Sequence, residues 1–117
     1  MALQVGINLI PATIQSGQSL SAEADIGAQT LVGIMVPSTW TTAPMSFQVS
    51  IDDVAFVEFQ SFEQSLPAAS VAGGTYLAVD PQVWRGINII KVRSGTLASP
   101  VNQTSTVTLE LVVKSVD

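Results

Sequence analysis

The 117-residue sequence contains no cysteine and no histidine. Without cysteine it cannot form disulfides, thiolate metal sites or a thiol nucleophile. Without histidine it lacks the commonest general base and transition-metal ligand, which excludes zinc hydrolases and Ser-His-Asp triads. An enzyme built on this chain would depend on carboxylate chemistry. We therefore predict a non-enzymatic protein that uses no cofactor and no metal.

Charge is also scarce, since 11% of the residues are charged, against about 25% in an average domain. The longest apolar run, residues 31–36, ends at Pro37 and is far shorter than the ~18–20 residues of a membrane span. The N-terminus has no basic region, so we expect no signal peptide. The composition fits either a β domain with a Ser- and Thr-rich exterior or a protein whose surface partly faces other subunits.

All four basic residues lie in the last third of a chain whose net charge is -5. An acidic chain is a poor ligand for phosphate backbones, so we expect no nucleic-acid partner. Arg85, Lys91 and Arg93 form the one local basic group. It fits either a strand face paired with nearby carboxylates or a docking patch for an acidic partner.

Alternating apolar and polar residues predict short strands along the whole chain. In residues 18–26, the even-numbered positions from Leu20 to Ile26 share one apolar face. The apolar run at 30–36 is typical of a central strand covered on both faces. Asp52-Asp53 and residues 80–84 are expected turns. The predicted strands cover residues 18–26, 30–36, 45–51, 55–60, 75–79, 87–93 and 104–113, with one more at 5–14 that Pro11 interrupts.

This pattern of about seven or eight short strands predicts an all-β protein, an antiparallel β-sandwich. A jelly-roll-like form is preferred, and an Ig-like Greek-key sandwich is the alternative. We expect one domain over residues 15–117. The uncharged residues 1–14 form either an apolar N-terminal arm or a first strand.

Two segments resemble known families. Residues 47–56, FQVSIDDVAF, resemble a hairpin of discoidin-like jelly-roll modules, which usually carry Gly where this chain has Asp53. Residues 79–96, VDPQVWRGINIIKVRSGT, with the later loop PVNQ at 100–103, are similar to a block in small structural proteins of tailed bacteriophages. Together the two segments span roughly half of the chain, and neither contains a catalytic signature.

The second resemblance implies a virion protein, with a capsid decoration (cement) protein as the preferred type. Proteins of that class sit on the capsid exterior as homo-oligomers, often trimers, and clamp the lattice of the major capsid protein. The expected partners are therefore the major capsid protein and further copies of this chain, with synthesis in the host cytoplasm. A tail- or fibre-associated module is the other placement that the resemblance allows.

Three groups of residues have both a functional and a structural interpretation. Asp52 and Asp53 fit a calcium site or a simple turn. Glu58 and Glu63 fit a glycosidase acid–base pair or solvent-facing charges. The aromatic rings fit a sugar-stacking platform, which makes a carbohydrate-binding module the alternative function, or core packing. These rings belong to Trp40, Tyr76 and Trp84.

Two contact regions are expected from the uneven charge: the apolar N-terminal segment and the basic strand near Lys91. The candidate partner or subunit contacts are Leu3, Val5, Ile7, Leu9, Trp40, Trp84, Arg85, Lys91 and Arg93.

Overall fold

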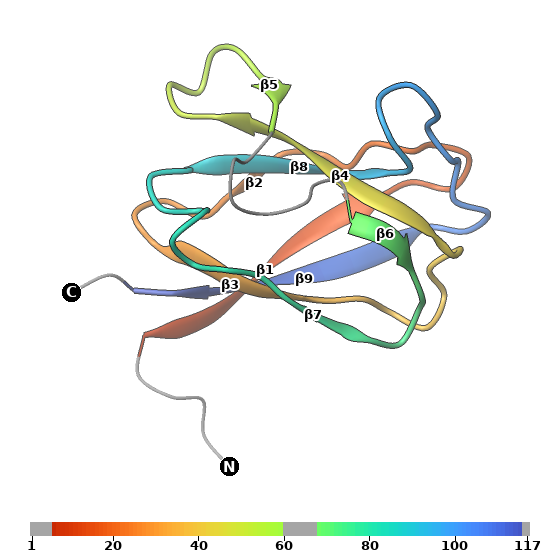
Figure 1. The fold of residues 1–117 in the computed structure, drawn as a ribbon, viewed down its shortest axis with the longest axis horizontal. Helices are drawn as coiled ribbons and strands as arrows, with labels where there is room; N and C mark the ends of the chain where they lie inside the picture. Colours follow the sequence, from red (N-terminus) through yellow and green to blue (C-terminus); the bar gives the residue numbers. More distant parts are fainter. Residues whose placement is uncertain (1–5, 60–67, 116–117) are drawn as a thin grey trace.

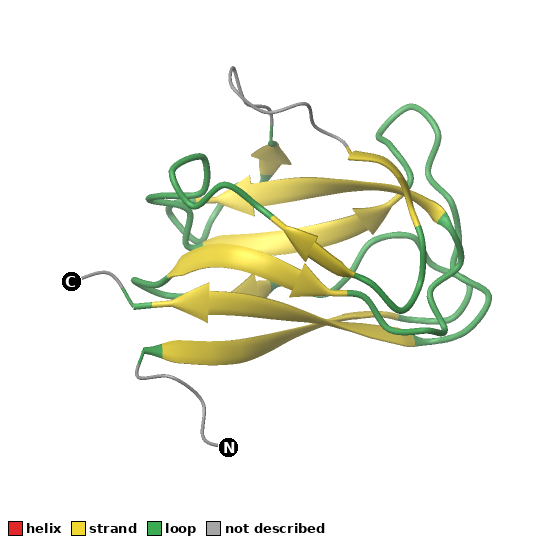
Figure 2. Ribbon diagram, turned by 60° about the horizontal axis from the view of Figure 1, so that its bottom comes forward, coloured by secondary structure: helices red, strands yellow, loops and turns green. Residues whose placement is uncertain are grey.

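The computed structural model describes residues 6–59 and 68–115, and within them it contains strands and loops but no helix (Figures 1 and 2). The strands are β1 Ile7–Ile14, β2 Ala24–Asp25, β3 Thr30–Met35, β4 Ala43–Ser50, β5 Val57–Glu58, β6 Ala68–Val71, β7 Tyr76–Ala78, β8 Ile89–Ser94 and β9 Val107–Lys114. They form two antiparallel sheets, in the orders β1-β9-β3-β7 and β2-β8-β4-β5, with β6 also paired to β4. An all-β antiparallel sandwich is thus confirmed.

The strand order is that of a jelly roll. The first four strands pair with later strands in reverse order, as β1–β9, β2–β8, β3–β7 and β4 with β5 and β6. The chain is therefore one long hairpin of paired strands that winds around the core and alternates between the sheets. This pairing confirms the preferred jelly-roll form over the Ig-like alternative.

The core lies between the two sheets. Where one face of a strand is exposed to solvent, the buried side chains follow the predicted alternation. On β9, Val107, Leu109, Leu111 and Val113 are buried while the residues between them are exposed or half-buried. On β4, the buried apolar side chains are Ala43, Met45, Phe47 and Val49. The β4–β5 hairpin also forms as predicted, with Gln48 opposite Glu58.

Pro11 does not interrupt the first strand. β1 runs from Ile7 to Ile14 and pairs with β9 along its whole length, with Pro11 opposite Glu110. Because β1 is the outer strand of its sheet, one of its edges needs no ladder hydrogen bonds, and a proline there costs no pairing.

The prediction of a continuous strand at 18–26 is wrong. Only Ala24–Asp25 form a strand, Ser21 is buried and Ala22 is exposed. The cause is that this segment crosses between the sheets. The amide of Ala22 donates to Thr13 O on β1 at 3.2 Å, and the amide of Ser21 donates to Val92 O on β8 at 2.8 Å. A segment bound to both sheets cannot keep one face on either.

The prediction that residues 30–36 are covered on both faces is also wrong in part. β3 is an interior strand between β9 and β7, and Leu31 and Ile34 are fully buried. A register shift between Leu31 and Gly33 keeps both Leu31 and Ile34 on the inner face, opposite the buried Val113 and Leu111 of β9, and leaves Gly33 and Met35 on the outer face. Met35 faces outward and remains 48% exposed.

Candidate interaction surfaces

The outward side of the β1-β9-β3-β7 sheet is a largely apolar surface. Strand register places Leu9, Val112, Gly33 and Ala78 in one line across the four strands. The adjacent line, two residues along each strand, contains Pro11, Glu110, Met35 and Tyr76. Residues in register on antiparallel neighbours share a face. We call these eight residues, with Lys114, the outer sheet face.

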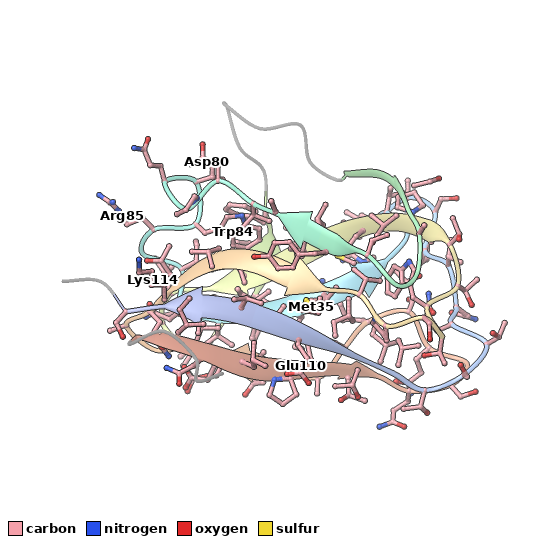
Figure 3. All side chains as sticks on the ribbon, turned by 90° about the horizontal axis from the view of Figure 1, so that it is seen from below. Met35, Asp80, Trp84, Arg85, Glu110 and Lys114 are labelled. Carbon is pink, nitrogen blue, oxygen red and sulfur yellow. The ribbon has the colours of Figure 1, made fainter. Side chains whose placement is uncertain are left out.

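Three large apolar side chains of this face are open to solvent: Leu9 is 46% exposed, Met35 48% and Tyr76 51%. Figure 3 looks onto the sheet, with Met35 on β3 and Glu110 and Lys114 at separate points along β9. A contiguous apolar surface of this kind usually marks a contact with another protein.

Tyr76 lies across Gly33 on this face. A Cβ atom built on Gly33 would be 1.8 Å from the Tyr76 hydroxyl oxygen and 2.2 Å from its ring carbon Cζ. The glycine thus lets the tyrosine ring lie flat on the sheet, as aromatic rings do over strand glycines in other sheets. The result is a smooth central region.

The polar groups of the outer sheet face lie apart from one another. Glu110 and Lys114 are two positions on either side of Val112 along β9, and each lies in its own line of residues. At the far end of the same strands, the hydroxyls of Thr13 and Thr108 hydrogen-bond at 3.0 Å. The charges therefore flank the apolar centre.

The predicted basic strand does not form an open basic patch. Arg93 is 5% exposed, and its guanidinium donates two hydrogen bonds to the Glu58 carboxylate, at 2.7 and 2.5 Å. A third donation reaches the Ser46 hydroxyl at 3.1 Å. The hydrogen bonds between Arg93 and Glu58 hold the pKa of Glu58 below its ordinary value and raise the pKa of Arg93. Within the described residues this is the one salt bridge.

The other two members of the basic group are separated from Arg93. Lys91 is half-buried, and its Nζ lies 4.5 Å from the centroid of the Phe56 ring, a cation–π contact. Arg85 is exposed in the loop before β8. The structural interpretation, a strand face paired with a carboxylate, fits Arg93, and the three cations do not form one docking patch.

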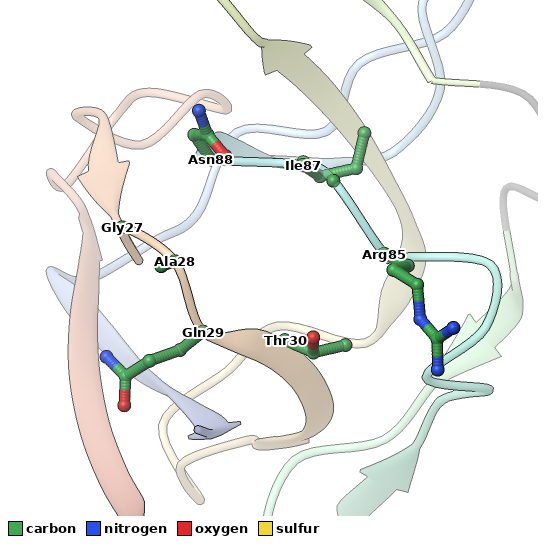
Figure 4. Close-up of a pocket in the computed structure, with 8 residues that line it drawn as sticks. Gly27, Ala28, Gln29, Thr30, Arg85, Ile87 and Asn88 are labelled. Atoms are coloured by element: carbon green, nitrogen blue, oxygen red, sulfur yellow. The ribbon is translucent and has the colours of Figure 1, made fainter. Parts of the chain in front are cut away.

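Arg85 borders a shallow hollow of about 230 Å³ between the loops at residues 27–30 and 85–88 (Figure 4). The two loops are tied together where the Ile26 amide donates to Asn88 O at 2.8 Å. Thr30 and Asn88 contribute polar groups and Ile87 an apolar wall. The hollow is small for a ligand pocket, which usually spans about 300–1,000 Å³.

The two candidate tryptophans are core residues. Trp84 is 0% and Trp40 4% exposed. Trp84 packs against Phe47 at 4.9 Å and Phe59 at 4.4 Å between ring centroids. The Trp40 indole N–H donates to Val71 O at 3.0 Å. Of the three rings considered for a sugar platform, only Tyr76 is exposed, so the platform does not form.

The acidic candidates have structural partners. Asp52 Oδ1 accepts hydrogen bonds from the amides of Val54 and Ala55, which lower its pKa, and Asp53 has a positive φ of 61°. They form the predicted turn, and no metal-binding group of three or more side chains occurs among the described residues.

Glu58 has a lowered pKa, whereas a glycosidase acid needs a raised one. Glu63 lies outside the described residues.

At the N-terminus, Ile7 is half-buried and Leu9 is exposed on β1. Leu3 and Val5 lie outside the described residues. The segment from Ile7 onward is thus part of the sheet, and Leu9 belongs to the outer sheet face.

The sequence pattern missed the other apolar members of that face, since Pro11, Met35 and Val112 come from three separate strands. The one sequence signal for this face was the alternation on β9, which placed Glu110 outward.

Gln103 was also missed, although it lies in the PVNQ segment. It is 1% exposed, and its carboxamide binds the Thr41 amide at 2.7 Å, Thr41 O at 3.2 Å and the Ser94 hydroxyl at 2.7 Å. Its backbone N–H donates to Gln18 O at 2.9 Å. The Gln103 side chain thus ties its loop to Thr41 and to the end of β8, and its backbone ties the same loop to Gln18.

No helix long and apolar enough to cross a membrane occurs among the described residues. Comparisons with protein-family models, curated proteins and solved structures found no match to this chain. The fold and the surfaces therefore define the protein's class: an antiparallel jelly roll with an apolar outer sheet face.

Proposed function

We propose that this chain is a structural protein of a bacteriophage virion, a capsid decoration protein that forms a homo-oligomer and stabilises the shell of the major capsid protein. The observation that carries this proposal is the outer sheet face. Leu9, Met35 and Tyr76 are each about half exposed, and such a face is typical of a surface that another protein covers.

The resemblance to phage structural proteins supports the virion setting, and the structure explains what that segment contributes. Trp84 and Arg93 within it are buried, and Gln103 of the PVNQ loop binds the Thr41 amide and the Ser94 hydroxyl at the end of β8. These residues specify the fold. Contacts with a capsid would instead use exposed groups such as Arg85.

The mechanism is mass action. A protein that binds the assembled shell and not its separated subunits stabilises the shell by RT ln(1 + [L]/Kd), about 2.7 kcal/mol at a concentration one hundred times Kd. Each bound copy would tie neighbouring capsid subunits together.

The test is to compare purified heads and purified tails by mass spectrometry and to heat heads with and without the protein. The proposal expects many copies on heads and a higher disruption temperature when they are bound. The chain's presence on tails alone would favour the tail-associated placement. Its absence from both would overturn the proposal.

A further inference from the structure

The outer sheet face is self-complementary in charge. Along β9 it carries Glu110, then Val112, then Lys114, all facing outward in three successive lines of the sheet. The two charged positions are four residues apart, about 13 Å at the usual strand rise. They are therefore too far apart to pair within one chain.

From this arrangement we infer that the outer sheet face binds a second copy of this chain, face to face, about a two-fold axis that crosses the strands over Val112. Rotation about that axis brings each β9 antiparallel over its partner's β9. Glu110 of each copy then faces Lys114 of the other, twice, and Val112 meets Val112 at the centre. This is an isologous interface, the usual kind in homodimers.

The charges also select the direction of the axis. A two-fold axis parallel to the strands would place Glu110 over the line of residues that contains the partner's own Glu110. That arrangement would bury two carboxylates without a cation. An axis across the strands satisfies both charges and leaves the apolar residues Leu9 and Met35 to be covered.

The surface between the charges suits close packing of two sheets. Gly33 and Ala78 lie in the Val112 line, and Tyr76 covers Gly33. Sheets stack about 10 Å apart, a distance that small and flat side chains permit.

The size of the face sets the expected affinity. Eight-residue strands of about 26 Å, four abreast at about 4.8 Å, give at most roughly 500 Å² on each copy. The total is near the ~1,000 Å² at which specific interfaces begin. The pair should therefore be a reversible dimer whose population rises with concentration.

Sedimentation equilibrium of the full chain, up to about 1 mM, tests this inference. Val112→Lys and Met35→Lys should each raise the dimer dissociation constant at least ten-fold. Val54→Lys, a charge added at a residue 82% exposed on the β4–β5 turn, is the matched control and should leave the constant unchanged. Circular dichroism verifies that each variant is folded.

A charge exchange tests the register of the two copies. Glu110→Lys alone and Lys114→Glu alone should each weaken the dimer, because like charges would then face each other twice. The double variant restores opposite charges and should recover most of the affinity. Failure to recover, a mass that stays at the 12.3 kDa of one chain, or a trimer would overturn the inference. The pairing does not depend on the virion role, since a dimer absent from heads would overturn only that role.

Discussion

Arg93 and Glu58 form a bidentate ion pair on the outward side of the β8-β4-β5 sheet, although 35 positions separate them in sequence. Ser46 and Gln48 complete it: the Ser46 hydroxyl accepts from the guanidinium, and the Gln48 amide donates to the carboxylate at 3.1 Å. The pair fixes the end of the β4–β5 hairpin to the centre of its sheet.

Glu58→Gln should lower the free energy of unfolding by about 1–3 kcal/mol, because it leaves the buried Arg93 cation without its counter-ion. That value lies between the ~0–1 kcal/mol of an exposed pair and the ~3–5 kcal/mol of a broken buried one. Urea unfolding measures it. Glu23→Gln, which neutralises an exposed glutamate, is the control. Equal effects of the two substitutions would contradict a stabilising ion pair.

The same pair predicts a pH dependence. Arg93 lowers the folded-state pKa of Glu58. The pair therefore stabilises the protein at pH values above about 4.3, the ordinary glutamate pKa. This contribution disappears as the pH falls through the lower folded-state pKa. The difference in Tm between wild type and Glu58→Gln should therefore be fully present above the ordinary glutamate pKa and shrink as the pH falls below it. A difference that stays constant as the pH falls would refute the assignment.

The sequence predicted those parts of the fold whose cause is local. Alternation on β9 identified its buried residues, and the Asp52-Asp53 pair identified the hairpin turn, because strand period and turn chemistry depend on neighbours in sequence. Residues 18–26 show where this logic stops. Their alternation is genuine, yet hydrogen bonds to Thr13 and Val92 on different sheets decide which side chains are buried.

The outer sheet face could not be predicted for a related reason. Its lines of residues come from β1, β9, β3 and β7, which are not consecutive in sequence, and a register shift of one residue would turn each side chain to the opposite face. For the tryptophans, core packing was one of two interpretations, and no neighbour in sequence chooses between them. Trp84 lies in an expected turn and is the largest fully buried side chain in the described structure.

Gln103→Leu should destabilise the protein by about 2–4 kcal/mol. The substitution keeps the approximate volume but leaves the Thr41 backbone groups and the Ser94 hydroxyl without partners, and each orphaned buried group costs about 1–3 kcal/mol. Thermal and urea unfolding measure the loss. Asn102→Leu, at the exposed neighbouring position, should change stability by less than about 0.5 kcal/mol. Similar losses at both positions would argue against the bridging role of Gln103.

Gly33→Ala should force the Tyr76 ring off the sheet, since the new methyl group would overlap the hydroxyl and ring carbons. The ring can swing away, so the expected cost is about 1 kcal/mol. In a Tyr76→Ala background the same glycine substitution should cost little or nothing. Urea unfolding of the four proteins gives the coupling between the two sites. Additive effects would show that the ring does not occupy the space above Gly33.

Asp53→Gly should stabilise the protein by about 0.5–1 kcal/mol. Asp53 has a φ of 61°, a left-handed conformation that glycine adopts without a Cβ penalty. The side chain of Asp52, and not that of Asp53, accepts the turn's hydrogen bonds from Val54 and Ala55, so none of these bonds is lost. Asp53→Val should destabilise by more than 1 kcal/mol, because a β-branched residue strongly disfavours positive φ. The opposite order of the two variants in thermal unfolding would mean that residue 53 does not hold this conformation in solution.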